Sequence, residues 1–130
     1  MLGGGRRRIS HVKNIVWVGS SRADLKAFPA EVKDVMGYAL YQAQIGLKAL
    51  SAKPLRGFGG AGILEIVENH QTDTYRAVYT VKFSNFIYVL HAFQKKSRKG
   101  IATPKPDIDL IQRRLRAAEE HYKAQDDKGI

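Results

Sequence analysis

The sequence predicts an α+β domain in which an antiparallel sheet is packed by an N-terminal pair of helices and a C-terminal helix. Three observations support this fold class: a short β-branched segment near the start, helical spacing of apolar residues in two separate segments, and three consecutive strand-like segments between them. The 130 residues fit one domain with a hydrophobic core. We expect residues 12–124 to form it, after a disordered arm over 1–11 and before a frayed tail over 125–130.

The first part of the domain is expected to hold one strand and two helices. Residues 14–19 are β-branched and aromatic and stop at a glycine, which is typical of a short strand. A helix over 21–28 is followed by a second over 29–45, because Pro29 suits the first turn of a new helix and Gly46 suits its C-terminal cap. The second helix carries a stripe of core residues at helical spacing: Val32, Val35, Met36, Ala39, Leu40 and Ala43.

Residues 47–62 are expected to form a loop, because they include a proline and four glycines. No Gly-Lys-Ser/Thr ending follows the glycines, so the segment is not a nucleotide-binding phosphate loop. Two interpretations stay open at this point. The loop is either a plain flexible connection or a substrate-facing segment whose Lys53 and Arg56 contact phosphates.

A three-stranded meander over 63–68, 74–83 and 86–94 is expected next. If Ser84 and Asn85 form a two-residue turn, residues whose numbers sum to 169 face each other across the last two strands. Alternation then places core residues on one face, namely Ala77, Tyr79 and Val81 with Ala92, Leu90 and Tyr88. The other face receives Arg76 and Val78 with Phe93 and His91, and Lys95 one step further on.

The C-terminal segment predicts one amphipathic helix that follows Pro104 and Pro106 and ends near Lys123. Its expected core residues are Ile108, Ile111, Leu115 and Ala118, and its expected outer residues are Arg113, Arg114 and Arg116.

The composition indicates a partner that carries negative charge. The 22 Lys and Arg residues against 12 Asp and Glu residues give a formal charge of +10, which favours nucleic acid or an acidic protein. The absence of cysteine suits the cytosol. The cations at the start are not followed by an apolar stretch, so we expect neither a signal peptide nor a membrane anchor, and a cytoplasmic location.

Four stretches of the sequence resemble a known toxin family: "VGSSRADLKAFPAEV", "KPLRGFGGAGILEI", "TYRAVYTV" and "YVLHAFQKKSRKGIATPKPDIDLI". The chain is similar, from about Asn14 to about Tyr122, to the phage-derived, HigB-like toxins of type II toxin–antitoxin pairs, within the RelE/ParE superfamily. This resemblance implies a small α+β toxin that cuts messenger RNA in the ribosome without a metal or another cofactor. It also implies an antitoxin partner, usually with a helix-turn-helix domain.

The residues can be assigned roles in that chemistry. Metal-free RNA cleavage needs a group that takes the 2′-OH proton, cations that stabilise a pentacoordinate phosphate, and a donor for the leaving oxygen. The expected catalytic residues are Arg76 and Lys95 with Lys96 as cations and His91 as acid or base, since the unperturbed pKa of a histidine lies near neutrality. The expected RNA-binding residues are Lys53, Arg56, Arg98 and Lys99.

Each of these residues also has a structural interpretation. Arg76 could pair with Glu65 or Glu68 across the sheet, and His91 could be a partly buried histidine hydrogen-bonded within the sheet. Lysines after a strand often discourage edge pairing. His121 and Tyr122 are weaker catalytic candidates late on the last helix. The spacing of His, Asp and Glu predicts no metal site.

Two other functions fit the same sequence. A ParE-like toxin would inhibit DNA gyrase without cutting RNA, and fold alone does not separate it from a nuclease. A plain nucleic-acid-binding module would explain the positive charge but not the collection of Arg76, His91 and Lys95 on one face.

Overall fold

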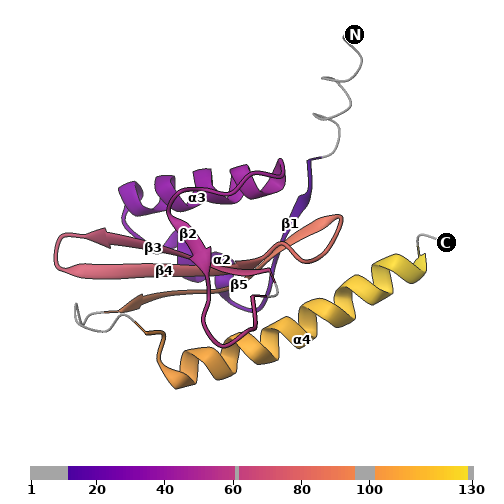
Figure 1. Cartoon of the computed structure of the whole chain (residues 1–130). Helices are drawn as coiled ribbons and strands as arrows, with labels where there is room; N and C mark the ends of the chain where they lie inside the picture. The colour runs from indigo at the N-terminus through magenta and orange to yellow at the C-terminus, as the bar shows by residue number, and fades with distance from the viewer. Residues whose placement is uncertain (1–11, 61, 96–101, 129–130) are drawn as a thin grey trace, which may run out of the picture.

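A five-stranded mixed sheet lies at the centre of the protein (Figure 1). The computed structural model describes residues 12–60, 62–95 and 102–128, with side chains described as far as residue 125. The strand order is β1-β5-β4-β3-β2. The strands are β1 (Asn14–Trp17), β2 (Ala52–Pro54), β3 (Ile63–His70), β4 (Asp73–Thr80) and β5 (Phe86–Lys95). The predicted α+β class is confirmed.

Two features of the sheet differ from the expected one. Strand β1 pairs in parallel with β5, so the sheet is mixed rather than antiparallel. Strand β2 lies inside the segment expected to be a loop, where it pairs with β3 through Lys53 and Glu65. It is only three residues long and ends at Pro54, which an edge strand tolerates because one side of its backbone needs no ladder hydrogen bond.

Helices cover both faces of the sheet (Figure 1). Helices α2 (Ser21–Lys26) and α3 (Ala30–Gln44) pack on one face, where the expected stripe of α3 joins the core. Helix α4 (Lys105–Lys128) packs on the other face through Ile111 and Ala118. It extends to Lys128 rather than ending near Lys123. The expected arm over 1–11 lies outside the described residues.

The pairing of β4 with β5 contains a β-bulge. Paired residue numbers sum to 169 from Thr74 and Lys95 through Val78 and His91, as predicted. From Tyr79, which pairs with Val89, the sum is 168, because Leu90 is an extra residue in β5. Five residues rather than two connect the strands.

The bulge changes which side chains of β5 face which helix. Tyr88 and Leu90 face α4 together with Val78, so their predicted placement with Ala77 and Tyr79 was wrong. The predicted pairs Arg76 with Phe93, Ala77 with Ala92 and Val78 with His91 are confirmed.

Arg114 fixes α4 against this bulge. Its Nη1 donates to the carbonyl oxygen of Leu90 at 2.9 Å, and its Nη2 donates to Ser20 Oγ at 3.1 Å. Gly19, with a φ of +60°, leaves room for the guanidinium, since a Cβ there would lie 2.7 Å from it. The expectation that Arg114 lies on the outer side of the helix was therefore wrong.

Candidate functional site

A row of side chains crosses four strands on the face of the sheet that α4 partly covers. The row runs Lys53, Glu65, Val78 and His91, because these residues are direct cross-strand partners in β2, β3, β4 and β5. Arg76 lies in the neighbouring row between Val67 and Phe93. Alternation thus places Lys53, Arg76 and His91 on one face of the sheet.

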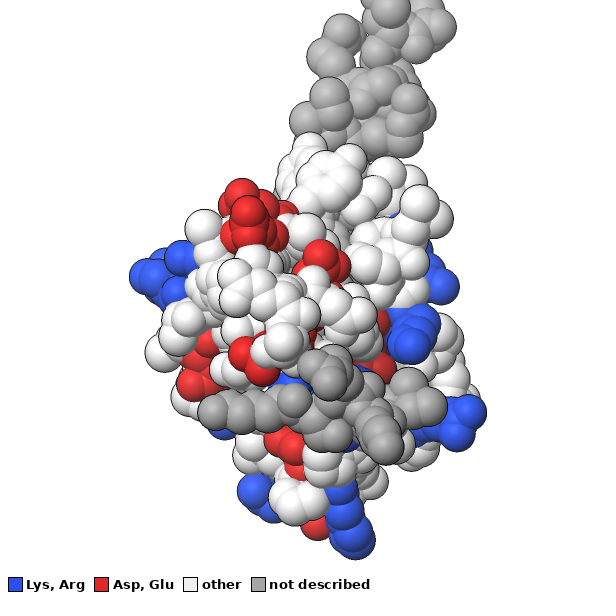
Figure 2. All heavy atoms as spheres, turned by 90° about the vertical axis from the view of Figure 1, so that its left-hand side faces the viewer, with Lys and Arg blue, Asp and Glu red and all other residues white. Residues whose placement is uncertain are grey.

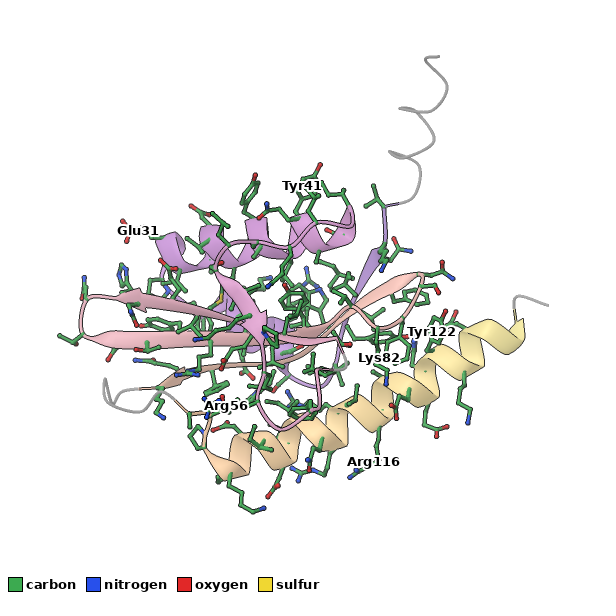
Figure 3. All side chains as sticks on the ribbon, viewed as in Figure 1. Glu31, Tyr41, Arg56, Lys82, Arg116 and Tyr122 are labelled. Carbon is green, nitrogen blue, oxygen red and sulfur yellow. The ribbon has the colours of Figure 1, made fainter. Side chains whose placement is uncertain are left out.

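An open pocket of about 370 Å³ lies at the β2 end of this row. Lys53 and Arg56 line it from one side, the carboxylate of Glu65 lies in its wall, and Ala102 and Thr103 line the opposite side. Lys53 and Arg56 are exposed, and Arg56 lies on the α4 side of the sheet near the start of that helix (Figure 3). The pocket therefore presents two exposed cations next to one buried carboxylate.

Glu65 is held by two donors from different segments. Arg76 Nη1 lies 2.6 Å from Glu65 Oε2, and Thr103 Oγ1 donates to the same oxygen at 2.9 Å. The side chains of Arg76 and Glu65 are only 4 % and 5 % exposed. Among the described residues, no donor is hydrogen-bonded to Glu65 Oε1, the second oxygen. Arg76 thus forms the buried ion pair that was its structural interpretation, and it does not lie open on a concave surface.

His91 and Lys95 contact the segment that leads into α4. His91 Nε2 lies 2.7 Å from Asp107 Oδ1, and the ring stacks on Phe93 with a centroid distance of 4.6 Å. His91 Nδ1 is buried and has no hydrogen-bond partner among the described residues. Lys95 Nζ donates to the carbonyl oxygen of Ala102 at 2.9 Å. His91 is therefore buried and hydrogen-bonded, but its partner lies on α4 and not, as its structural interpretation had it, within the sheet.

The structure sorts the predicted site residues into two groups. Lys53 and Arg56 line the pocket, whereas Arg76, His91 and Lys95 each contact a residue between Ala102 and Asp107. Neighbouring strands lie about 4.8 Å apart, so the backbones of Lys53 and His91 are separated by roughly 14 Å, which is wider than one phosphate. The remaining candidates lie outside the described residues: Lys96, Arg98 and Lys99.

Thr103 was not singled out by sequence reasoning. It belongs to the pocket only because the chain returns beside β3 after β5, and the "TP" that precedes the helix was its one local signal. Glu65 was considered only as a partner of Arg76, and its place in a pocket wall depends on β2.

A second polar contact lies near the far end of α4. Tyr88 Oη lies 2.7 Å from His121 Nδ1, and Phe86 and Tyr122 pack around them. The pKa of Tyr88 is raised to about 12, mainly by burial and to a smaller extent by the nearby Tyr122. Lys82 pairs with Glu119 beside this cluster. These residues join β5 to α4 and lie away from the pocket, since they share no residue with its lining.

The positive charge is not spread evenly. On the face drawn in Figure 2, Lys and Arg side chains lie mostly toward the rims, and Asp and Glu side chains interrupt them nearer the centre. Within the described part of the chain, no three His, Cys, Asp or Glu side chains are grouped so that they could hold a metal ion. In the same residues no helix is long and apolar enough to cross a bilayer.

The fold and the pocket define a small, strongly basic α+β domain with an open cationic pocket at one edge of its sheet. Residues 23–116 match the family described as phage derived protein Gp49-like (DUF891), and the chain belongs to that family. The resemblance to a phage-derived family is thereby confirmed at this level, and the finer HigB-like assignment stays a prediction.

The chain is also similar to a chain of a solved structure. The toxin–antitoxin complex RelBE2 from Mycobacterium tuberculosis contains a chain that is 21 % identical, with a TM-score of 0.42; the match covers 65 % of this chain and 99 % of that one. No curated protein matches the sequence.

Proposed function

We propose that this protein is the toxin of a type II toxin–antitoxin system and a metal-independent endoribonuclease that cuts messenger RNA on the ribosome. The observation that carries the proposal is the open pocket in which Lys53 and Arg56 flank the held carboxylate of Glu65. The family membership, the resemblance of the sequence motifs and the formal charge of +10 support it.

The pocket suits a phosphodiester beside a ribose. Arg56 offers a planar fork of donors and Lys53 a compact charge, and both stabilise the extra negative charge of a pentacoordinate phosphate. Glu65 Oε1 accepts the proton of the attacking 2′-OH, while Arg76 and Thr103 hold the carboxylate through Oε2. Arg76 is then a positioning residue.

The other predicted residues act around the pocket. His91 lies two strands from Glu65, about 10 Å between backbones, and in this proposal it protonates the leaving oxygen after Nε2 leaves Asp107. Lys95 holds Ala102 in the pocket wall. Lys96, Arg98 and Lys99 are proposed to hold the RNA backbone. The partner is a cognate antitoxin with a helix-turn-helix domain, and the site of action is the cytoplasm.

Expression of a pocket variant tests the proposal. The wild-type chain is expected to arrest translation and to leave transcripts cut at ribosome-bound positions, as read by sequencing of transcript ends. Lys53→Ala with Arg56→Ala should relieve the arrest and abolish the cuts, because both cations of the pocket are lost. Arg22→Ala with Lys26→Ala removes one Arg and one Lys from exposed positions on α2, and this matched control should stay toxic.

Two results would overturn the assignment. Growth arrest with intact transcripts and an induced DNA-damage response would show a ParE-like action instead. Full toxicity and unchanged cuts in the folded pocket variant would remove Lys53 and Arg56 from the site, with folding checked by circular dichroism.

A further inference from the structure

Strand β1 uses only one side of its backbone for hydrogen bonds within the sheet. The N–H groups of Asn14 and Val18 donate toward β5 at 3.2 and 3.0 Å, so the even-numbered residues face that strand. Because backbone groups alternate along a strand, those of Ile15 and Trp17 point away from β5. Among the described residues, neither the N–H nor the C=O of Ile15 or Trp17 has a hydrogen-bond partner. The outer side of β1 is therefore an open edge of the sheet.

The open part of this edge is short and has definite ends. Before Ile15 it is closed by the end of α3, since Lys13 N–H donates to the carbonyl oxygen of Gln44 at 3.0 Å and Gln44 Nε2 donates to the carbonyl oxygen of Lys13 at 2.6 Å. After Trp17 the strand ends, and the chain turns at Gly19, whose φ is +60°. The open edge therefore runs from Ile15 to Trp17, which suits a short partner strand.

The two edges of the sheet differ in composition. At the other edge, β2 carries Lys53 and Pro54, and a charge and a proline are features with which proteins block the pairing of edge strands. The open edge of β1 consists of Ile15, Val16 and Trp17, which include no charge and no proline. All three are half-buried, and β-branched and aromatic residues favour strand pairing. An edge of this kind is a template for a further strand.

The same three residues complement one another in an antiparallel arrangement. A twofold axis at Val16, perpendicular to the sheet, places Ile15 of each chain opposite Trp17 of the other. A hydrogen-bonded antiparallel pair exchanges both of its N–H···O=C bonds, so the two pairs satisfy every open backbone group of Ile15 and Trp17. Their side chains also lie together on the face that α2 and α3 cover, where each pair joins a β-branched and an aromatic residue. Val16 meets its own copy on the face of α4.

We propose that a second copy of this chain pairs with β1 edge to edge, so that the two sheets are joined through antiparallel Ile15–Trp17 segments about a twofold axis at Val16. Any extended strand would satisfy the backbone groups, but this segment also supplies matching side chains on both faces. The pocket with Lys53 and Arg56 lies at β2, which is the opposite edge of the sheet, so the pairing leaves it uncovered.

Sedimentation velocity together with amide hydrogen exchange, followed by NMR over a wide range of concentrations, tests the dimer. The N–H groups of Ile15 and Trp17 should be protected only at concentrations at which a dimer forms. The N–H of Val16 is the internal control, because it lies in the ladder to β5 and should be protected throughout. A chain that is monomeric at every concentration, or a dimer in which Ile15 and Trp17 still exchange rapidly, would overturn the proposal. Protection that is independent of concentration, or that appears only when another protein is added, would overturn the second copy as the occupant.

A proline at position 15 separates the open edge from the ladder. Ile15→Pro removes an outward N–H and places a ring where the partner strand would lie, but it removes no bond to β5. By symmetry the dimer loses two of its hydrogen bonds, so the association constant should fall by about tenfold or more. Ile15→Val is the matched control, because it keeps the N–H and a β-branched side chain, and it should still associate. An Ile15→Pro variant that is folded by circular dichroism and associates like the wild type would overturn the pairing.

Single cysteines test the register, since the chain contains no cysteine of its own. In the proposed pairing Val16 lies opposite its own copy with Cα atoms about 4.5 Å apart, which a disulfide can bridge. Ile15 lies diagonally from its own copy at about 7–8 Å, which is beyond that reach. Mild oxidation should therefore cross-link Val16→Cys into a covalent dimer and leave Ile15→Cys largely uncross-linked. Equal cross-linking of both variants, or the reverse preference, would overturn the antiparallel register at Val16.

Discussion

Replacing Arg76 by alanine is expected to destabilise the fold severely, because it leaves the carboxylate of Glu65 buried without its ion-pair partner. The two side chains are 2.6 Å apart and almost fully buried. Removing one partner of a buried pair costs about 3–5 kcal/mol. Thr103 still donates to the carboxylate, so we expect a loss near about 3 kcal/mol, out of a total stability of about 5–15 kcal/mol for a domain. The unfolding temperature should fall by about 10 °C or more.

Urea denaturation followed by the fluorescence of Trp17, the one tryptophan, measures this loss. Arg76→Leu combined with Glu65→Leu should recover most of the stability, since a buried pair can be replaced by apolar residues at little cost. Arg22→Ala is the exposed control. A loss below about 1 kcal/mol for Arg76→Ala would refute the reasoning, because that value is typical of an exposed pair. The result also decides how the activity of Arg76 variants is interpreted, since an unfolded chain is inactive whatever the role of Arg76.

Three further predictions concern buried tyrosines and one glycine. Tyr79→Phe should leave the free energy of unfolding unchanged or raise it by up to about 1 kcal/mol in urea denaturation, because the buried hydroxyl has no hydrogen-bond partner among the described residues. Burial raises the pKa of Tyr79 to about 12, and burial with a neighbouring tyrosine does the same for Tyr88. An unfolded tyrosine loses its proton near pH 10, so between about pH 10 and 12 the folded chain holds more protons than the unfolded chain. The free energy of unfolding should therefore fall as the pH rises through this range. An ultraviolet absorbance titration should show two tyrosines that ionise later than the others. Gly19→Ala should cost about 1–3 kcal/mol in thermal unfolding, and adding Arg114→Ala should recover only part of it, because the clash is removed but the positive φ remains.

Side-chain alternation made the β4–β5 pairing near Arg76 predictable from sequence. The sum of 169 holds from Thr74 to Val78, where the apolar and polar faces differ clearly and a slip would expose the core. The bulge at Leu90 was not predictable in this way. The carbonyl oxygen of Leu90 accepts a hydrogen bond from Arg114. Arg114 lies on α4, which begins ten residues after the end of β5. A local pattern contains no information on such a contact.

The same limit applies to β2 and the pocket. Three residues ending at a proline in a glycine-rich segment are too short to show alternation, and they form a strand only because β3 offers a free edge. The sequence therefore located Lys53 and Arg56 as phosphate-binding candidates but could not place Glu65 between them and Thr103.

Burial decides which cations can recognise a phosphate directly. A ligand that binds Arg76 must first separate it from Glu65, which strands a carboxylate in the interior at a cost of several kcal/mol. Lys53 and Arg56 are exposed and line the open pocket, so they exchange water for a phosphate at no such cost. The cations that contact the RNA phosphate directly are therefore expected at β2, while Arg76 and Lys95 act through Ala102 and Thr103, which they hold in place.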